Sequence, residues 1–196
     1  MTLENICKQF DTKQVLKGVS HEFAAGECTC ILGESGGGKT TLLRIMMGLT
    51  KPDSGRVIGI QGKLMSAVFQ EDRLCMGLTA GANLRLVNPA MSKQEAALML
   101  GCAGLEDEQI PVRSLSGGMR RRVAILRALA VQYDILFMDE PLRGLDEVNH
   151  TRMMEYLKNQ TAGKTVICVT HNENEAEFLA TVPLLRLQVN HKGHGF

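Results

Sequence analysis

The sequence predicts an α/β fold with a mostly parallel core sheet, a small antiparallel β region and an inserted helical subdomain. Short apolar runs typical of buried strands alternate with helical patterns, and a glycine-rich loop joins one such strand to a helix. A central stretch is helical throughout. At 196 residues the chain has the length of one domain. We therefore expect a single domain over residues 1–196, with a core formed by 1–70 and 132–196 and the helical subdomain at 71–131.

Strands dominate the first third of the predicted fold. They are expected at Thr2–Ile6, Val15–Phe23, Cys28–Leu32, Arg56–Ile60 and Met65–Phe69. The unbroken run Cys28–Leu32 is typical of a strand that is buried on both faces. A helix is predicted over Thr40–Gly48, and Lys51–Gly55 predicts a turn because it combines Pro, Asp, Ser and Gly.

Helices are predicted through the middle of the chain, and they alternate with strands after it. Thr79–Leu86 and Lys93–Gly101 are separated from their neighbours by Pro89 and Pro111, and a long helix begins at Gly117. The later elements are predicted as strands Ile135–Met138, Thr165–Thr170 and Leu184–Val189 and helices Glu147–Gln160 and Asn174–Ala180. His191–Phe196 is expected to be a frayed tail.

Composition argues against several classes of protein. The net charge of +1 gives no bulk attraction to nucleic acid, and aromatic residues are only 4% of the chain, which disfavours a base-stacking surface. Cys28, Cys30 and Cys168 lie in apolar runs, so we interpret them as small core residues rather than as disulfide or zinc ligands. Neither a signal peptide nor a membrane-spanning run is recognised, so a cytoplasmic setting is expected.

The strongest motif is the loop Gly33-Glu-Ser-Gly-Gly-Gly-Lys-Thr40, which lies between a predicted strand and a predicted helix. It matches the phosphate-binding loop G-x-x-x-x-G-K-[ST], whose glycines let backbone N–H groups surround phosphate oxygens. The helix that follows directs its positive end at the anion. Lys39 is expected to reach the β- and γ-phosphates, and the Thr40 hydroxyl is expected to bind Mg²⁺. A kinase, a GTPase and an ATPase would all share this loop.

Two further strands end in polar residues. Ile135–Met138 is followed by Asp139 and Glu140, and Val166–Thr170 by His171. The carboxyl ends of parallel strands form the edge where ligands bind. Asp139 is therefore expected to hold Mg²⁺, and Glu140 to orient and deprotonate an attacking water. His171 is expected to contact the γ-phosphate, although a lone histidine is more often structural.

The segment Leu115-Ser-Gly-Gly-Met119 begins the long helix and is a second potential anion site. A Ser hydroxyl and glycine N–H groups can bind phosphate at a helix start, but they are equally good helix caps. A single ATP does not need two such cradles from one chain. A symmetric dimer explains both, because each helix start can face the ATP that the other subunit holds.

Together these motifs resemble the ATP-binding cassette (ABC) ATPases, a family of P-loop NTPases. Gly33–Thr40 corresponds to Walker A, Leu115–Met119 to the signature motif and Ile135–Asp139 to Walker B. The resemblance implies that Phe10 stacks on adenine. It also implies that a contiguous set of residues binds ATP: Gly33, Glu34, Ser35, Gly36, Gly37, Gly38, Lys39, Thr40 and Thr41. On pattern alone Phe10 could equally be a core residue.

The resemblance also assigns roles outside the phosphate loop. Gln70 resembles the glutamine that senses Mg²⁺ and the membrane partner, Asp146 the aspartate of the D-loop at the dimer interface, and His171 the switch histidine. Ser116, Gly117 and Gly118 would contact the ATP of the partner chain, and Lys39, Glu140 and His171 would be catalytic. Met119 stands where the signature motif usually has glutamine.

Among ABC proteins, Val68–Leu74 and Leu78–Leu84 are similar to importer ATPases of the nitrate, sulfonate and taurine type. The resemblance implies a homodimer on the inner face of the membrane, a separate permease and, for import, an extracytoplasmic solute-binding protein. A non-transport ABC ATPase and a nucleotide-gated regulatory module are the alternatives.

Two surface features are left open by the sequence. The apolar cluster Leu74, Cys75, Met76 and Leu78 could be core of the helical subdomain or line a groove for the permease. Arg120–Arg122 could suggest nucleic-acid contact, but such a run on a helix is usually a solvated face or a partner for carboxylates.

Overall fold

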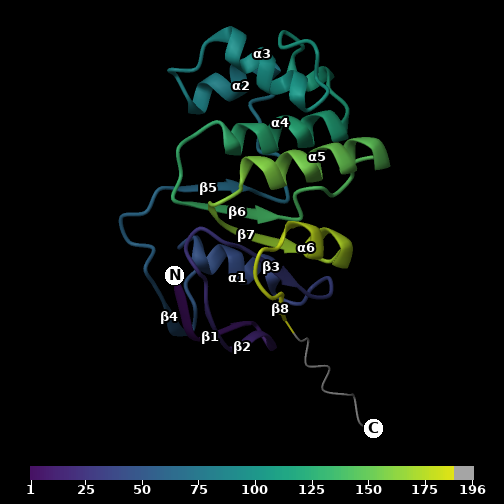
Figure 1. Cartoon of the computed structure of the whole chain (residues 1–196). Coiled ribbons are helices and arrows are strands. Elements are labelled where there is room, and N and C mark those ends of the chain that lie inside the picture. Colours follow the sequence, from purple (N-terminus) through teal and green to yellow (C-terminus); the bar gives the residue numbers. More distant parts are fainter. Residues whose placement is uncertain (188–196) are drawn as a thin grey trace.

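The computed structural model describes residues 1–187 and contains two sheets (Figure 1). The larger has five parallel strands in the order β5-β6-β7-β3-β8, and the smaller has three antiparallel strands in the order β2-β1-β4. The strands are β1 (Thr2–Phe10), β2 (Lys13–Glu22), β3 (Cys28–Leu32), β4 (Ser54–Ile58), β5 (Met65–Val68), β6 (Ile135–Asp139), β7 (Thr165–Thr170) and β8 (Leu185–Arg186). The predicted mostly parallel sheet with a small antiparallel region is confirmed.

Six α-helices connect the strands of the described chain. They are α1 (Lys39–Met46), α2 (Ala80–Val87), α3 (Lys93–Cys102), α4 (Gly117–Leu129), α5 (Glu147–Gln160) and α6 (Glu173–Leu179). Figure 1 shows α2 and α3 at one end of the molecule and the antiparallel sheet at the other. Several helices begin where a polar side chain caps them; Ser92, for example, forms a reciprocal capping box with Glu95 at the start of α3.

The parallel sheet separates two hydrophobic cores because the side chains of its strands alternate between the two faces. On β6, Leu136 and Met138 belong to one core and Ile135 and Phe137 to the other. The first core includes residues of α2 through α6, and the second includes α1 and the antiparallel sheet. Burial on both faces explains why the central strands are continuous apolar runs.

The carboxyl ends of the central strands position the site. Cys30 of β3 is paired with Cys168 of β7, and Met138 of β6 is also paired with Cys168. With this register, the phosphate loop after β3, the acidic pair after β6 and the histidine after β7 emerge at one edge of the sheet. The three cysteines Cys28, Cys30 and Cys168 are buried in the first core, as predicted.

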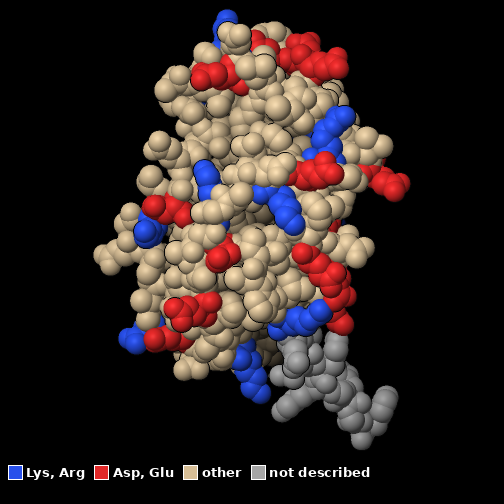
Figure 2. All heavy atoms as spheres, viewed as in Figure 1, with Lys and Arg blue, Asp and Glu red and all other residues tan. Residues whose placement is uncertain are grey.

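Other sequence expectations need correction. Arg121 and Arg122 are only 4% and 6% exposed, so these two residues are neither a solvated face nor a nucleic-acid patch. Their guanidinium groups donate mainly to backbone carbonyls, which compensates for burying the charge. The alternative of a carboxylate partner is found for Arg121, whose Nη1 lies 3.4 Å from Asp72 Oδ1. On the face shown in Figure 2, Lys and Arg are interspersed with Asp and Glu.

The apolar cluster after Gln70 is mostly exposed rather than core. Met76 and Leu78 are 45% and 38% exposed, and Cys75 is exposed as well, whereas Leu74 packs partly against the first core. Of the predicted strand Leu184–Val189, the structure gives β8 at Leu185–Arg186; the remainder from residue 188, including the His191–Phe196 tail, lies outside the described residues. No helix among the described residues is long and apolar enough to span a membrane.

Candidate nucleotide-binding site

The phosphate loop runs from the end of β3 to the start of α1, and its glycines are needed for different reasons. Gly36 and Gly38 have φ values of 76° and 85°, in the left-handed region that glycine adopts without strain. A Cβ at Gly38 would lie 2.8 Å from the Val15 carbonyl oxygen, so the loop also packs closely against β2. A Cβ at Gly36 would meet no atom within 4 Å. The loop therefore leaves open space beside Gly36, as a cradle for a phosphate requires.

Lys39 is the first residue of α1 and its ammonium folds back over the loop. Its Nζ donates to the carbonyl oxygens of Gly33 at 2.6 Å and Glu34 at 2.8 Å. The side chain is 5% exposed, and burial lowers the pKa of Lys39 while Glu140 and Asp139 act in the opposite direction. A buried cation next to these acidic residues is suited to bind a phosphate oxygen.

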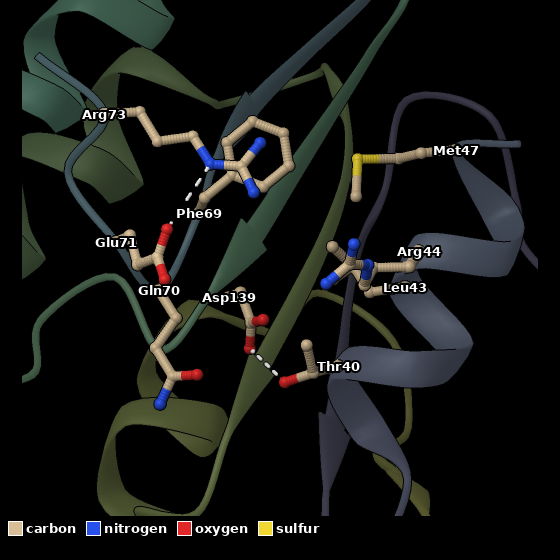
Figure 3. A pocket seen from close by; sticks show the side chains of 9 residues that line it. All are labelled: Thr40, Leu43, Arg44, Met47, Phe69, Gln70, Glu71, Arg73 and Asp139. Atoms are coloured by element: carbon tan, nitrogen blue, oxygen red, sulfur yellow. Dashed lines mark hydrogen bonds and ion pairs between the residues drawn. The ribbon is translucent and has the colours of Figure 1, made fainter. Parts of the chain in front are cut away.

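Thr40 and Asp139 form the first pair of oxygen groups at this edge. The Thr40 hydroxyl donates to Asp139 Oδ1 at 3.1 Å, as Figure 3 shows. Asp139 is 3% exposed, and burial raises its pKa whereas the Thr40 hydrogen bond lowers it. Gln70 lines the same cavity from the end of β5. A hydroxyl, a carboxylate and an amide oxygen are ligands that suit Mg²⁺, and a cation would offset the cost of the buried carboxylate.

Glu140 and His171 form the second pair. Glu140 Oε1 lies 3.1 Å from His171 Nδ1, and Oε2 lies 3.4 Å from Nη1 of Arg143. Glu140 has a φ of 46°, which is strained for a residue with a Cβ. The Glu140 side chain is 11% exposed, whereas those of His171 and Arg143 are more than half exposed. The carboxylate is thus held beside the cavity that Ser35, Gly36, Lys39 and Thr40 line.

The signature segment lies at the start of α4. The Ser116 side chain caps the helix by accepting from the Met119 N–H at 3.2 Å, so its capping role is real. Ser116 and Gly117 are exposed, and Gly118 is half-buried. Among the described residues that line the cavity beside the phosphate loop, none comes from this segment. An exposed segment that does not line the cavity beside its own phosphate loop is compatible with the dimer predicted from the sequence.

Two further predicted residues, Asp146 and Phe10, line neither of the two cavities described above. Asp146 is exposed and caps α5, where hydrogen bonds from Asn149 lower the pKa of its carboxyl group. Phe10 ends β1 and is 48% exposed, with the Lys8 ammonium 5.3 Å from its ring centre. Phe10 is therefore not a core residue, and an exposed aromatic face is what a stacking role would need.

Sequence reasoning missed two arginines at the site. Arg143 was not assigned a role, although it contacts Glu140, and Arg121 was treated only as part of a basic run. The position of Arg143, three residues after Glu140, was a signal for the first contact. No sequence signal pointed to the contact between Arg121 and Glu140, because that contact depends on how α4 packs against the end of β6.

The comparisons with known proteins agree with this geometry. The ABC transporter family model matches residues 16–143. The taurine import ATP-binding protein TauB of Pseudomonas aeruginosa is 37% identical, over 92% of this chain and 76% of that protein. The aliphatic sulfonates import ATP-binding protein SsuB 1 of Shouchella clausii is 36% identical, over 92% of this chain and 74% of that protein. The Nod factor export ATP-binding protein I of Ralstonia nicotianae is also 36% identical, over 91% of this chain and 61% of that protein.

A solved structure supports the same assignment. The dimeric structure of a post-hydrolysis state of an ATP-binding cassette bound to ADP and Pi matches with a TM-score of 0.83 and 32% identity, over 95% of this chain and 94% of that one. The match in sequence and fold extends through the phosphate loop, both acidic residues and the signature segment. This chain belongs to the ABC transporter family and is an ATP-binding cassette ATPase.

Proposed function

We propose that the chain is the ATP-hydrolysing subunit that powers import of a small solute through a separate membrane permease. The observation that carries the hydrolytic part is the placement of Glu140. Its carboxylate is within 3.1 Å of His171 and lines the cavity beside the phosphate loop. A general base must lie within hydrogen-bonding reach of the proton it accepts, and the place of Glu140 among the phosphate-loop residues that line this cavity supports that role.

The proposed reaction transfers the γ-phosphoryl group of ATP to water. Backbone N–H groups of residues 33–40 bind the phosphates, and Lys39 exchanges its carbonyl acceptors for phosphate oxygens. Glu140 accepts a proton as the water oxygen attacks the γ-phosphorus. The bond from that phosphorus to the bridging oxygen breaks, and ADP leaves with the oxygen. His171 orients the Glu140 carboxylate and contacts the γ-phosphate.

We place Mg²⁺ at the Thr40 hydroxyl, the Asp139 carboxylate and the Gln70 amide. The Thr40–Asp139 hydrogen bond shows that these two oxygens already lie together, and Gln70 lines the same cavity. Bound Mg²⁺ would neutralise charge on the phosphate oxygens. The role of the protein is to hold these ligands next to the phosphate loop and to keep Asp139 out of water.

The functional unit in this proposal is a homodimer. Ser116, Gly117 and Gly118 of each chain face the γ-phosphate held by the other, Asp146 lies at the interface, and Phe10 stacks on adenine. The exposure of Ser116 and Gly117 supports this arrangement, as does the similarity to cassettes solved as dimers. ATP closes the dimer only through its higher affinity for the closed state, and hydrolysis then reopens it.

The transport role follows from the relatives. Import of taurine and of aliphatic sulfonates appears in the names of two relatives, and a third acts in export at similar identity. We favour import because two segments resemble importer ATPases: Val68–Leu74, which contains Gln70, and Leu78–Leu84, which follows it. The expected location is the inner face of the membrane, with an extracytoplasmic solute-binding protein delivering the solute. The relatives give no support to a non-transport function.

The test of the proposal is ATPase activity across a range of protein concentrations, for the wild type and Glu140→Gln. Specific activity that rises with concentration and is lost in the variant supports composite sites in a dimer. Glutamine has nearly the same shape as glutamate but cannot accept a proton, so the variant should bind ATP and accumulate as a closed dimer. Turnover that is independent of concentration and insensitive to Glu140 would refute the mechanism.

A further inference from the structure

Arg121 lies near the start of α4, is 4% exposed and binds the backbone on both sides of the Glu140 side chain. Its Nε donates to the Pro141 carbonyl at 2.8 Å. Its Nη2 donates to the carbonyls of Asp139 at 2.9 Å and Glu140 at 2.7 Å. The guanidinium therefore fixes three successive peptide carbonyls, and the middle one belongs to the proposed catalytic base.

The same guanidinium also binds the segment that follows β5. Its Nη1 donates to the Phe69 carbonyl at 2.5 Å and lies 3.4 Å from both the Gln70 carbonyl and Asp72 Oδ1. Burial lowers the pKa of Arg121, and the Asp72 carboxylate acts in the opposite direction. With all three nitrogens donating, Arg121 joins the Gln70 segment and the Glu140 segment through one planar, rigid group.

The backbone of Glu140 depends on such support. Its φ of 46° is a left-handed conformation that residues with a Cβ rarely adopt. The Glu140 N–H donates to the Val169 carbonyl at 2.8 Å, which holds the amide side of the residue. Arg121 holds the carbonyl side. If that hold is lost, the peptide can relax toward an ordinary φ, and the carboxylate then moves relative to His171.

We propose that Arg121 is a positioning residue for hydrolysis, which holds Glu140 in its left-handed conformation and ties it to the helix that starts at the signature segment. This inference rests on the proposed role of Glu140 as the base. Because α4 begins directly after Ser116, a shift of the helix when the dimer closes acts on Glu140 and on the Gln70 segment together.

Arg127 offers a matched comparison on the same helix. It donates from Nη1 to the Arg73 carbonyl at 2.8 Å and from Nη2 to the Asp72 carbonyl at 3.2 Å. It thus binds the segment after β5 as Arg121 does, and within residues 1–187 it makes no hydrogen bond to residues 139–141. Glutamine at either position removes the charge and can replace only part of the donor set.

The experiment compares Arg121→Gln, Arg127→Gln and Glu140→Gln with the wild type. The measurements are kcat and KM for ATP, Tm, and ATP-driven dimerisation, with kcat normalised to the fraction of protein that binds a fluorescent ATP analogue. For Arg121→Gln we expect kcat to fall about 10- to 100-fold while KM stays within about threefold, because a small displacement of the base affects the chemical step and not nucleotide binding. Arg127→Gln should keep kcat within about twofold.

A second measurement separates positioning from folding. In the Glu140→Gln background, hydrolysis can no longer reopen the dimer. Adding Arg121→Gln to this variant should therefore leave the ATP-driven dimer intact if Arg121 acts only through the base. A normal kcat for Arg121→Gln would overturn the inference. So would a fall in kcat that is explained by a lower Tm and is equally large in Arg121→Gln and Arg127→Gln. If Arg121→Gln does not fold, Arg121→Lys is tested instead. A kcat at least about fivefold below that of the wild type, at unchanged KM, supports the inference, and a kcat within about twofold of the wild type refutes it. Turnover that survives Glu140→Gln refutes the role of Glu140 as the base, and with it the mechanism on which this inference rests.

Discussion

Glu140 Oε1 and His171 Nδ1 lie 3.1 Å apart although the residues are separated by 31 positions in the sequence. The sheet brings them together. Asp139 at the end of β6 is paired with Val169 of β7, so the residues that follow the two strands emerge side by side. Parallel register therefore brings the two residues to the same sheet edge, and the left-handed backbone of Glu140 sets where its carboxylate lies there.

Replacing His171 with alanine should lower kcat on the order of 10- to 100-fold with little change in KM for ATP. The imidazole orients the Glu140 carboxylate but does not bind the adenine or the α-phosphate in this arrangement. Steady-state kinetics over a range of ATP concentrations measure both constants. A fall in kcat/KM that is entirely due to KM would show that His171 binds ATP instead of assisting the reaction.

Arg143→Ala is the comparison for the other oxygen of the same carboxylate. Arg143 Nη1 lies 3.4 Å from Glu140 Oε2, but its side chain is 58% exposed. Exposed ion pairs contribute little, so the change in kcat should stay below about fivefold. A larger loss than in His171→Ala would make Arg143 the more important partner of Glu140.

Asp139→Asn should stabilise the nucleotide-free protein while removing Mg²⁺-dependent turnover. Burial raises the pKa of Asp139, so its charge costs folding free energy at neutral pH. Asparagine keeps an oxygen acceptor for Thr40 without that charge. We expect Tm to rise by a few degrees, at about 2–4 °C for each kcal/mol gained in a chain of this size.

The pH dependence of this difference follows from the direction of the shift. Above the raised pKa of Asp139 the folded wild type holds a buried charge, and the variant is the more stable. As the pH falls through that pKa the carboxyl group takes up a proton, and below the ordinary value of 3.8 the difference disappears. Thermal unfolding of both proteins without nucleotide or Mg²⁺, over a pH series, measures it. A difference in Tm between the two proteins that grows as the pH falls would contradict the raised pKa of Asp139.

Much of the fold could be predicted because its local signals agree with one another. The unbroken apolar runs at β3, β6 and β7 identify buried strands, and the glycines that precede α1 are followed directly by Lys39 and Thr40. These signals lie within short windows of sequence. They also predicted which side chains meet at the sheet edge, since strand ends of a parallel sheet share that edge.

The rest depends on contacts between distant segments. A run of charged residues such as Arg120–Arg122 normally indicates a solvated face. Here Arg121 and Arg122 are buried because carbonyl oxygens from other segments converge on them. Similarly, the exposure of Phe10 and Met76 depends on where β1 and the segment after β5 end relative to the rest of the fold. Hydrophobicity alone cannot report this exposure.

Gly38→Ala should destabilise the protein far more than Gly48→Ala. Both glycines have positive φ, at 85° and 72°, so alanine is strained at each position by about 1 kcal/mol. At Gly48 a Cβ would meet no atom within 4 Å, whereas at Gly38 it would lie 2.8 Å from the Val15 carbonyl oxygen. The added clash brings the expected cost at Gly38 to about 2–4 kcal/mol. Denaturant unfolding measures the loss in free energy of unfolding for each variant. Equal losses would mean that the phosphate loop can move away from β2 to accommodate the added Cβ.

Met76→Glu and Leu78→Glu should weaken assembly with the permease while leaving ATP binding unchanged. Both side chains are exposed, at 45% and 38%, and they follow the Gln70 segment that is proposed to sense the membrane partner. A carboxylate in an apolar contact loses its hydration without gaining a partner, so we expect the complex to be at least about tenfold weaker.

Leu98→Glu is the matched control for these variants. Leu98 lies on α3 and is 66% exposed, so it tests the effect of adding a negative charge at an exposed leucine outside the Gln70 segment. Co-purification with the permease measures assembly, and a fluorescent ATP analogue measures binding by the isolated chain. Normal assembly of the Met76 and Leu78 variants would exclude this surface, and equal loss in Leu98→Glu would indicate a general effect of charge. Loss confined to Met76 and Leu78 would locate the contact next to Gln70, where a movement of the permease could reach the Mg²⁺ ligands through only a few residues.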